Sequence, residues 1–471
     1  MRLLWTAEEM VEATGGVMQA PFAATGVCID SRSLQRGDLF IALAGESRDG
    51  HDFVADALAR GAAGALVHRD VPGLPTNAPL LRVDDAQAAL TRLGAYARAR
   101  FGGKLVAVTG SVGKTTTKEM LRVILAAQGT THAAVASFNN HLGVPLTLAR
   151  LAAEAAWCVV EIGMNHAGEI KPLAKLARPH VALITNVENT HLGHLGSIEA
   201  IADEKIAIAR GLEPGGFIVL PADAPLLPRL RAAVAGQKVI TFGASADADT
   251  RLLDIKGDAE GTSLTVDIAG RRLSTRLAAP GRHMALDALA ALTAATALGA
   301  DLAVGAHALA GFTPVAGRGA RRQIAVAGGT ALLLDESYNA SSSAMRAALS
   351  VLRLQPARRR LAVLGDMLEL GEAGPGEHRA LADDVSASAD LVFTCGPLMR
   401  HLHDVLPTAQ RGAHADDSAA LAPLVAGVVS AGDAILVKGS LGSRMQRIVA
   451  VLAPPEHSED APETPSGAEK T

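Results

Sequence analysis

The chain has 471 residues, of which 49% are hydrophobic, so it can form about three domains with buried cores. A formal net charge of -4 and an aromatic content of 3% argue against a nucleic-acid-binding protein, which needs basic surfaces and stacking side chains. Three widely spaced cysteines, no signal-peptide pattern and no apolar run of membrane-spanning length predict a cytoplasmic protein.

Residues 1–100 are predicted to form a small α/β domain. Strands are expected within 36–43 and 65–67, and the spacing of apolar residues predicts a helix over 53–63. The residue types leave two interpretations open, a domain with a solvated polar loop or a recognition domain. In the second interpretation the recognition side chains are Ser31, Arg32, Asp49 and His51.

A strand, a glycine loop and a helix follow one another at the start of the central domain, residues 101–314. The apolar run 105–108 predicts a buried strand, and 115–127 predicts a helix. A glycine loop with Lys and Thr in this setting can cradle phosphates and bind Mg²⁺, although a plain strand–turn–helix corner is the alternative. Val108 stands where the usual pattern has its first glycine, so the loop is a shortened variant. The candidate phosphate-binding residues are Gly110, Ser111, Val112, Gly113, Lys114, Thr115 and Thr116.

Two further strands of the central domain end in polar residues. The strand 157–161 ends at Glu161, and the strand 181–185 is followed by Asn186 and then His191. Ligands gather at the carboxyl ends of parallel strands, and a carboxylate beside a phosphate loop suits Mg²⁺. We therefore expect Glu161 to bind a metal ion, the alternative being a solvated strand end.

The rest of the central domain mixes loops, helices and short strands. A polar loop is expected at 137–146 and a helix at 147–153. Ser197 is expected to cap another helix, in which Lys205 has acidic neighbours and by type is an ordinary surface lysine. Residues 221–280 are predicted to be rich in short strands with alternating polar and apolar residues.

A third domain is predicted over residues 315–453. Its strands alternate with helical segments, which predicts a second parallel sheet, and they are expected at 331–334, 360–364, 391–394 and 434–437. Polar residues at the strand ends are candidate substrate contacts, among them Asp335, Glu336, Tyr338, Asn339 and Lys438. The tail 454–471 consists mainly of Pro, Glu, Ser and Ala and is predicted to be disordered.

Taken together, these motifs resemble the Mur ligase family over nearly the whole chain except the tail. The central domain carries Thr109-Gly-Ser-Val-Gly-Lys-Thr-Thr116, Phe138-Asn-Asn-His-Leu-Gly-Val-Pro-Leu146, Glu161-Ile-Gly-Met-Asn-His-Ala-Gly-Glu169, Thr185-Asn-Val-Glu-Asn-Thr-His191 and Ala202-Asp-Glu-Lys205. The branch that adds D-alanyl-D-alanine is indicated by Asp335-Glu-Ser-Tyr-Asn-Ala340, Leu364-Gly-Asp-Met-Leu-Glu-Leu-Gly371 and Val437-Lys-Gly-Ser440. A uridine-nucleotide domain is indicated by Asp30-Ser-Arg32 and Gly37-Asp-Leu-Phe-Ile-Ala-Leu43.

The resemblance implies three α/β domains: a small N-terminal domain, a central P-loop-type ATPase domain with a parallel sheet, and a C-terminal Rossmann-like domain. It implies an ATP-dependent, ADP-forming amide ligase of peptidoglycan synthesis, acting as a monomer. Such an enzyme joins D-alanyl-D-alanine to a UDP-N-acetylmuramoyl-tripeptide through an acyl phosphate. ATP and two Mg²⁺ ions are the implied cofactors.

The family pattern also implies roles for individual residues. Besides the phosphate loop, ATP contacts would come from Asn140, His283, Arg318, Asp335 and Glu336. Metal ligands would be Thr115, Glu161, His191 and Lys205, with Lys205 carrying a carbamate formed with CO₂. Residues acting directly in the reaction would be Lys114, His191 and Lys205. Substrate contacts would be Ser31, Arg32, Asp49, His51, Asn139, Asn186, Tyr338, Asn339 and Lys438.

One position departs from the family pattern. The loop before the alanine-rich helix usually reads Gly-x-His-Asn, and its Asn contacts the nucleotide. Here it reads Gly281-Arg-His-Met284, so His283 rather than Met284 is the candidate for that contact.

Three alternatives are weighed against this interpretation. A sister ligase adding a diamino acid would be expected to carry an Asp-Asn-Pro-Arg loop, which the sequence lacks. A folylpolyglutamate-synthase-like ligase shares the central fold, but the third-domain motifs argue against it. A nucleotide-driven switch would use the same loop without ligation, and the residues around Glu161 and His191 argue against that.

Overall fold

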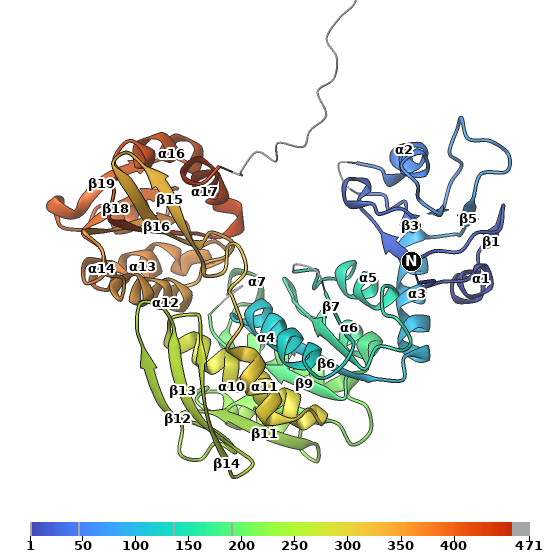
Figure 1. The fold of residues 1–471 in the computed structure, drawn as a ribbon, viewed down its shortest axis with the longest axis horizontal. Helices are drawn as coiled ribbons and strands as arrows, with labels where there is room; N and C mark the ends of the chain where they lie inside the picture. Colours follow the sequence, from blue (N-terminus) through green and yellow to red (C-terminus); the bar gives the residue numbers. More distant parts are fainter. Residues whose placement is uncertain (1, 46–47, 135–136, 190–191, 455–471) are drawn as a thin grey trace, which may run out of the picture. The chain divides into compact units, whose positions relative to one another are not determined.

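The computed structural model describes residues 2–45, 48–134, 137–189 and 192–454, so the predicted tail lies, from residue 455, outside the described part. The chain divides into two compact units, Met1–Thr313 with Glu369–Gly371, and Pro314–Leu368 with Glu372–Thr471 (Figure 1). The described strands form three sheets of five, nine and six strands. The predicted α/β fold class is confirmed.

The first sheet has the strand order β1-β5-β4-β3-β2, with β1 antiparallel and the others parallel. Its strands are β1 (Val17–Met18), β2 (Gly26–Cys28), β3 (Asp38–Ile41), β4 (Gly64–Val67) and β5 (Leu80–Arg82). Its helices are α1 (Ala7–Thr14), α2 (Val54–Ala59) and α3 (Ala86–Arg100). Side chains alternate along β3, so Leu39 packs with residues of α1 and α3, whereas Phe40 packs with residues of α2.

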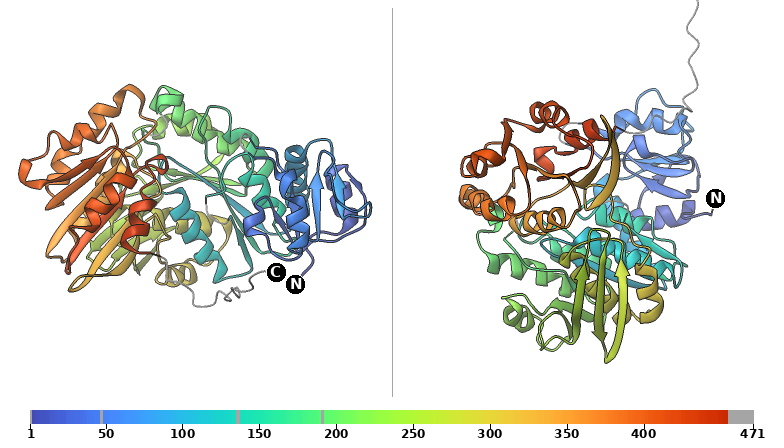
Figure 2. Two further views of the ribbon diagram at one scale, coloured as in Figure 1. Left: turned by 90° about the horizontal axis from the view of Figure 1, so that it is seen from above. Right: turned by 60° about the vertical axis from the view of Figure 1, so that its left-hand side comes forward.

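The nine-stranded sheet has the order β14-β13-β12-β11-β10-β9-β6-β8-β7. Its strands are β6 (Lys104–Thr109), β7 (Thr131–Ala133), β8 (Trp157–Glu161), β9 (Val181–Ile184), β10 (Phe217–Pro221), β11 (Lys238–Gly243), β12 (Thr250–Gly257), β13 (Thr262–Ile268) and β14 (Arg271–Leu277). The strands from β7 to β12 pair in parallel, and β12, β13 and β14 add an antiparallel extension, drawn in yellow-green in Figure 2. The helices are α4 (Lys114–Ala126), α5 (Gly143–Ala149), α6 (Ile170–Ala177), α7 (Leu192–Leu195), α8 (Ile198–Ile206), α9 (Leu227–Ala233), α10 (Arg282–Leu298) and α11 (Leu302–Leu309).

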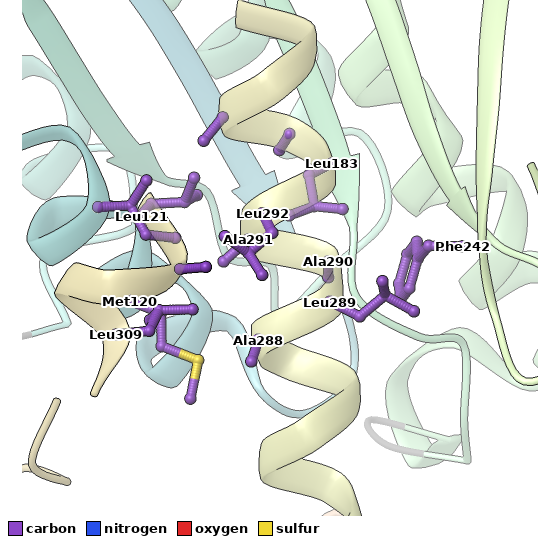
Figure 3. Packing of buried hydrophobic residues seen from close by; sticks show 14 of the residues in the cluster. Met120, Leu121, Leu183, Phe242, Ala288, Leu289, Ala290, Ala291, Leu292 and Leu309 are labelled. Atoms are coloured by element: carbon purple, nitrogen blue, oxygen red, sulfur yellow. The ribbon is translucent and has the colours of Figure 1, made fainter. Parts of the chain in front are cut away.

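Strand β6 lies inside this sheet and is buried on both faces. Val106 and Val108 pack into a core with residues of α4, α10 and α11, seen from close by in Figure 3. Leu105 and Ala107 pack into the opposite core with residues of α5, α6 and α8. Because β6 pairs with both β8 and β9, the loop that follows β6 begins between the carboxyl ends of those two strands.

The helix predicted at 147–153 is wrong in position. Helix α5 spans Gly143–Ala149, and the prediction had placed a loop over its first residues. The side-chain oxygen of Asn140 accepts hydrogen bonds from the N–H groups of Leu142 and Gly143, which caps the first turn. Pro145 is tolerated because it stands in that first turn, where its N–H would have no helical partner.

The six-stranded sheet of the second unit has the order β15-β16-β20-β17-β18-β19. Its strands are β15 (Ala320–Val326), β16 (Gly329–Glu336), β17 (Arg359–Gly365), β18 (Leu391–Cys395), β19 (Arg411–Ala415) and β20 (Asp433–Lys438). Its helices are α12 (Ser342–Arg353), α13 (Gly374–Arg379), α14 (Ala382–Ser386), α15 (Arg400–His403), α16 (Ser418–Ala426) and α17 (Gln446–Leu452). The four predicted strands are present as β16, β17, β18 and β20 and pair in parallel, whereas the outer strands β15 and β19 were not predicted. Strand β15 pairs antiparallel with β16 across a tight turn at Gly328, whose φ is 82°.

Candidate active site

The loop after β6 has the backbone conformation that its glycines allow. Gly110 and Gly113 have φ angles of 151° and 80°, and Gly113 immediately precedes helix α4. A Cβ atom at Gly110 would lie 1.8 Å from the hydroxyl oxygen of Thr185. The Nζ atom of Lys114 donates to the carbonyl oxygens of Gly110 (2.7 Å) and Ser111 (3.2 Å). The loop is therefore wrapped around the lysine at a helix N-terminus, an arrangement that binds anions.

The chain after β9 holds this loop in place. The side-chain oxygen of Asn186 accepts from the N–H of Val112 (2.9 Å), and its backbone carbonyl accepts from the N–H of Ser111 (3.1 Å). The hydroxyl of Thr185 donates to the carbonyl of Val112 (2.6 Å). Asn186, a predicted substrate contact, thus contacts the phosphate loop.

Thr115 and Glu161 meet at the carboxyl end of β8. The Thr115 hydroxyl donates to Oε2 of Glu161 (2.8 Å), and the Asn139 amide donates to Oε1 (2.7 Å). The hydroxyl oxygen of Ser137 lies 3.2 Å from that of Thr115. Thr115 and Glu161 are buried, with 3% and 1% of their surface exposed. The structure therefore brings together Thr115, Glu161 and Asn139, which were predicted from three separate motifs.

Lys205 is not the surface lysine that its residue type indicated. The confirmed Ser197 cap starts α8, and Lys205 in this helix is 1% exposed. Burial first, and the positive charge of Lys114 second, lower the pKa of Lys205 well below that of a free lysine. A buried amine with a lowered pKa is readily neutral. The predicted partner His191 lies outside the described residues.

Glu204, the residue before Lys205, was not predicted from the sequence to have a role in the site. Its two carboxylate oxygens accept from the N–H groups of Gly168 and Ile170, both at 2.8 Å. Glu204 therefore fixes the end of the loop after β8 against the helix that carries Lys205.

The start of helix α10 brings another acidic group to the phosphate loop. Met284 is 3% exposed and packs in the core, whereas His283 is half-buried. One helical turn later, Oδ1 of Asp287 lies 2.5 Å from the place a Cβ atom would occupy at Gly113. Loss of contact with water first, and the charge of Glu188 in addition, raise the pKa of Asp287 to about 8. Sequence reasoning missed Asp287, whose only signal was a carboxylate within an alanine-rich helix.

The raised pKa of Asp287 predicts a pH dependence of stability. Between pH 4 and 8 the folded chain keeps a proton on Asp287 that the unfolded chain has lost, so stability falls as the pH rises through this range. Asp287→Asn should remove this pH-dependent contribution to the free energy of unfolding. The melting temperature of Asp287→Asn relative to wild type should increase up to about pH 8 and then level off. A constant difference for Asp287→Asn would contradict the assignment.

The predicted N-terminal residues form two local clusters. Arg32 pairs with Asp30 at 2.6 Å, and its hydrogen bonds lower the pKa of Asp30 to about 2. His51 is buried, with its Nδ1 atom 2.6 Å from Asp49 and its Nε2 atom accepting from the N–H of His68. Asp49 also pairs with Arg69. Both ring nitrogens of His51 are thus used inside the domain, whereas Arg32 is exposed.

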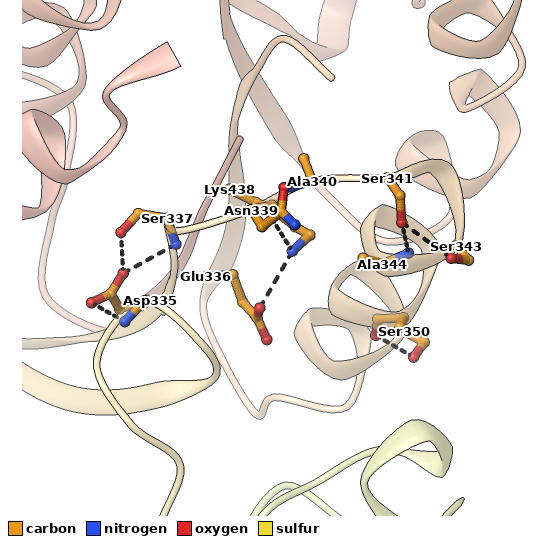
Figure 4. Close-up of polar contacts among 12 residues, drawn as sticks. Asp335, Glu336, Ser337, Asn339, Ala340, Ser341, Ser343, Ala344, Ser350 and Lys438 are labelled. Atoms are coloured by element: carbon orange, nitrogen blue, oxygen red, sulfur yellow. Dashed lines mark hydrogen bonds and ion pairs between the residues drawn. The ribbon is translucent and has the colours of Figure 1, made fainter. Parts of the chain in front are cut away.

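In the second unit, polar residues gather at the ends of β16 and β20 (Figure 4). The Asp335 carboxylate accepts from the N–H of Gly317 (2.9 Å) and from the hydroxyl of Ser337 (2.6 Å), so it braces the strand end. The ammonium of Lys438 lies 3.3 Å from Glu336 and 3.0 Å from the carbonyl of Asn339. Separately, the guanidinium of Arg318 lies 4.3 Å from the ring centre of Tyr338.

The chain is similar to known protein families and proteins over most of its length. The chain matches the Mur ligase middle domain over residues 108–295, the Mur ligase glutamate ligase domain over 320–441 and the Mur ligase family catalytic domain over 23–98. It is 35% identical to the UDP-N-acetylmuramoyl-tripeptide–D-alanyl-D-alanine ligase of Escherichia coli (strain K12), over 95% of this chain and 98% of that one.

Among solved structures, MurF from Acinetobacter baumannii superposes with a TM-score of 0.83 at 32% identity, covering 96% of this chain and 99% of that one. MurF ligase from Thermotoga maritima, solved in complex with ADP, superposes with a TM-score of 0.74 at 27% identity, covering 91% and 96%.

Proposed function

Because the chain belongs to the Mur ligase family, we propose that it joins D-alanyl-D-alanine to a UDP-N-acetylmuramoyl-tripeptide with ATP, forming ADP, in the synthesis of peptidoglycan for the bacterial cell wall. The observation that carries this proposal is the likeness to ligases of that specificity along nearly their full length, 98% of the Escherichia coli chain. The phosphate loop wrapped around Lys114 supplies the site that such chemistry needs.

The reaction has two steps. A carboxylate oxygen of the tripeptide attacks the γ-phosphorus of ATP, the bond to ADP breaks, and an acyl phosphate forms. The dipeptide amine then attacks the acyl carbon, and the tetrahedral intermediate expels phosphate while the amine loses a proton. These steps need positioning and charge neutralisation rather than a protein nucleophile. Lys114 supplies positive charge beside the transferred γ-phosphoryl group. The N–H groups at the start of α4, from Gly113 to Thr116, orient the phosphates, since those of Ser111 and Val112 already donate to Asn186.

The donor set around Glu161 fits Mg²⁺. The Thr115 hydroxyl and the Glu161 carboxylate lie 2.8 Å apart and offer the oxygen ligands that Mg²⁺ prefers. We propose that Thr115 and Glu161 hold one ion, and that His191 and Lys205 hold a second. Within the described residues no group of three His, Cys, Asp or Glu side chains could hold a metal ion, and this proposal adds the Thr115 hydroxyl and a modified Lys205 as ligands. Bound Mg²⁺ would neutralise charge on the phosphates.

Lys205 is proposed to carry a carbamate. An ammonium would repel Mg²⁺, whereas a carbamate offers anionic oxygens. Carbamate forms when the neutral amine adds to CO₂ and loses a proton, and the lowered pKa of Lys205 supplies that neutral amine.

The three predicted domains are proposed to divide the remaining contacts. Residues 1–100 would bind the uridine end through Ser31 and Arg32, with Asp49 and His51 supporting the domain from inside. Residues 101–314 would place Asn139 and Asn140 between nucleotide and tripeptide, with His283 near the nucleotide. Residues 315–453 would supply the remaining contacts to ATP and substrates, from Arg318, Asp335, Glu336, Tyr338, Asn339 and Lys438.

We further propose a monomeric enzyme in the cytoplasm, where ATP and the UDP-linked precursor are available. In the described part of the chain, no helix is both long and apolar enough to span a membrane.

Phosphate release measured with and without D-alanyl-D-alanine tests the proposal. Release should require both the dipeptide and a UDP-linked tripeptide, and mass spectrometry should detect the new amide. A panel of tripeptides that differ in the third residue would define the substrate further. Release that needs a single amino acid instead would indicate a sister ligase, and slow hydrolysis indifferent to the dipeptide would indicate a nucleotide switch.

A further inference from the structure

Lys118 is a fully buried charged residue to which the reaction assigns no role. It lies on α4, one turn after Lys114, and none of its surface is exposed. Its Nζ atom donates to the carbonyl oxygen of Ala134 (2.8 Å) and lies 2.6 Å from a carboxylate oxygen of Glu119. The long side chain thus joins the helix of the phosphate loop to the end of strand β7.

Stability alone is a poor explanation for this burial. Removing an ammonium and a carboxylate from water costs about as much free energy as their attraction returns, so buried ion pairs add little net stability. They can, however, impose one arrangement on the groups around them, because an unpaired buried charge is costly. The hydrogen bond from Lys118 fixes the position of the backbone at Ala134.

The segment 137–139, which comes after Ala134 in the chain, carries two side chains of the candidate active site. The hydroxyl of Ser137 lies 3.2 Å from that of Thr115, and the amide of Asn139 donates to Glu161 at 2.7 Å. The carbonyl of Asn139 in turn accepts from the N–H of Gly163 at 2.8 Å. Helix α4 therefore contacts this part of the chain at two places, Lys118 at Ala134 and Thr115 at Ser137, which are three residues apart on the helix.

We propose that Lys118 is a positioning residue for the ligase reaction. Its ammonium fixes the Ala134 carbonyl, and this anchor keeps Ser137 beside Thr115 and Asn139 beside Glu161. The inference rests on the proposed role of Thr115 and Glu161 in phosphoryl transfer. It assigns to Lys118 a larger effect on kcat than on the binding of ATP, because the loop before α4 is held by Thr185 and Asn186 and not by Lys118.

The test compares Lys118→Met with Arg122→Met. Methionine keeps the apolar stem and removes the charge, whereas Arg122 pairs with the same Glu119 at 2.7 Å from the exposed side of the helix. Lys118→Met should lower kcat at least about 10-fold and change the Kd for ATP, measured without peptide, by less than about 3-fold. Arg122→Met should change both kcat and the Kd for ATP by less than about 2-fold. Equal losses in kcat and ATP binding for Lys118→Met would overturn the proposal, since they would indicate general damage to the fold.

A double-mutant cycle with Asn139→Ala locates the effect. If Lys118 acts through this segment, the double variant should be no slower than the slower single variant within about 3-fold. Losses that multiply would overturn the proposal.

Amide hydrogen exchange of the peptide 137–144 gives a readout independent of activity. Exchange in that peptide should be faster in Lys118→Met while exchange in α4 is unchanged, and unchanged exchange in both would count against the proposal. Should the methionine variant fail to fold, Lys118→Gln is measured in the same way. If the wild-type chain releases no dipeptide-dependent phosphate, the proposed function fails, but the exchange experiment still tests the anchoring by Lys118.

Discussion

Lys114→Ala should lower kcat at least about 10²-fold. The ammonium of Lys114 lies within the phosphate loop, 2.7 Å from the carbonyl of Gly110, where it can neutralise charge that develops on the transferred phosphoryl group. A single preorganised donor of this kind is worth about 3 kcal/mol, which corresponds to a factor of about 10² in rate. Initial rates of phosphate release at saturating substrates measure the effect.

Lys171→Ala is the matched control for Lys114→Ala. Lys171 lies exposed on α6, and its removal should leave the rate within about 2-fold of wild type. Equal melting temperatures of the two variants would show that the loss is not a loss of fold. Turnover of Lys114→Ala within about 3-fold of wild type would refute the assignment of the phosphate loop.

Lys205→Ala should be nearly inactive, with a loss on the order of 10²-fold or more, and should regain activity with short carboxylic acids. Alanine removes the proposed carbamate, and an acid such as acetate can place an anionic oxygen in the vacated space next to Mg²⁺. Phosphate release with increasing acetate measures the rescue. Lys175→Ala, an exposed lysine on α6, should be fully active and unaffected by acetate.

The modification itself has a spectroscopic test. Wild-type protein in ¹³C-labelled bicarbonate should show a carbamate carbon signal that Lys205→Ala lacks. Ordinary activity of Lys205→Ala in CO₂-depleted buffer would show instead that the lysine has a structural role.

The elements that the sequence determined are those with a local pattern. The apolar run at 105–108, the glycine loop and the following helix were each predicted within about a residue of β6 and α4. Ser197 caps α8 as predicted because its hydroxyl needs only an N–H three residues away. Such features depend on neighbours in the chain, so the sequence contains the information that specifies them.

The tertiary structure decided what depends on distant residues. Helix α5 begins at Gly143 rather than 147, and its residues pack into two cores, Val144 against residues of the nine-stranded sheet and Leu146 against those of the first sheet. The outer strand β15 exists because β16 offers it a pairing edge, which no property of residues 320–326 alone reveals. Propensity is a weak signal when packing and pairing contribute more.

The chemistry of the candidate site divides in the same way. The sequence indicated Lys114, Thr115 and Glu161 by motif and by position at strand ends, but Asp287 and Lys118 were not recognised, and Lys205 was assigned a role only through the family resemblance. Their unusual properties come from burial, which raises the pKa of Asp287 to about 8 and lowers that of Lys205. Burial depends on which segments fold over a side chain, and for these residues the segments lie far away in the sequence.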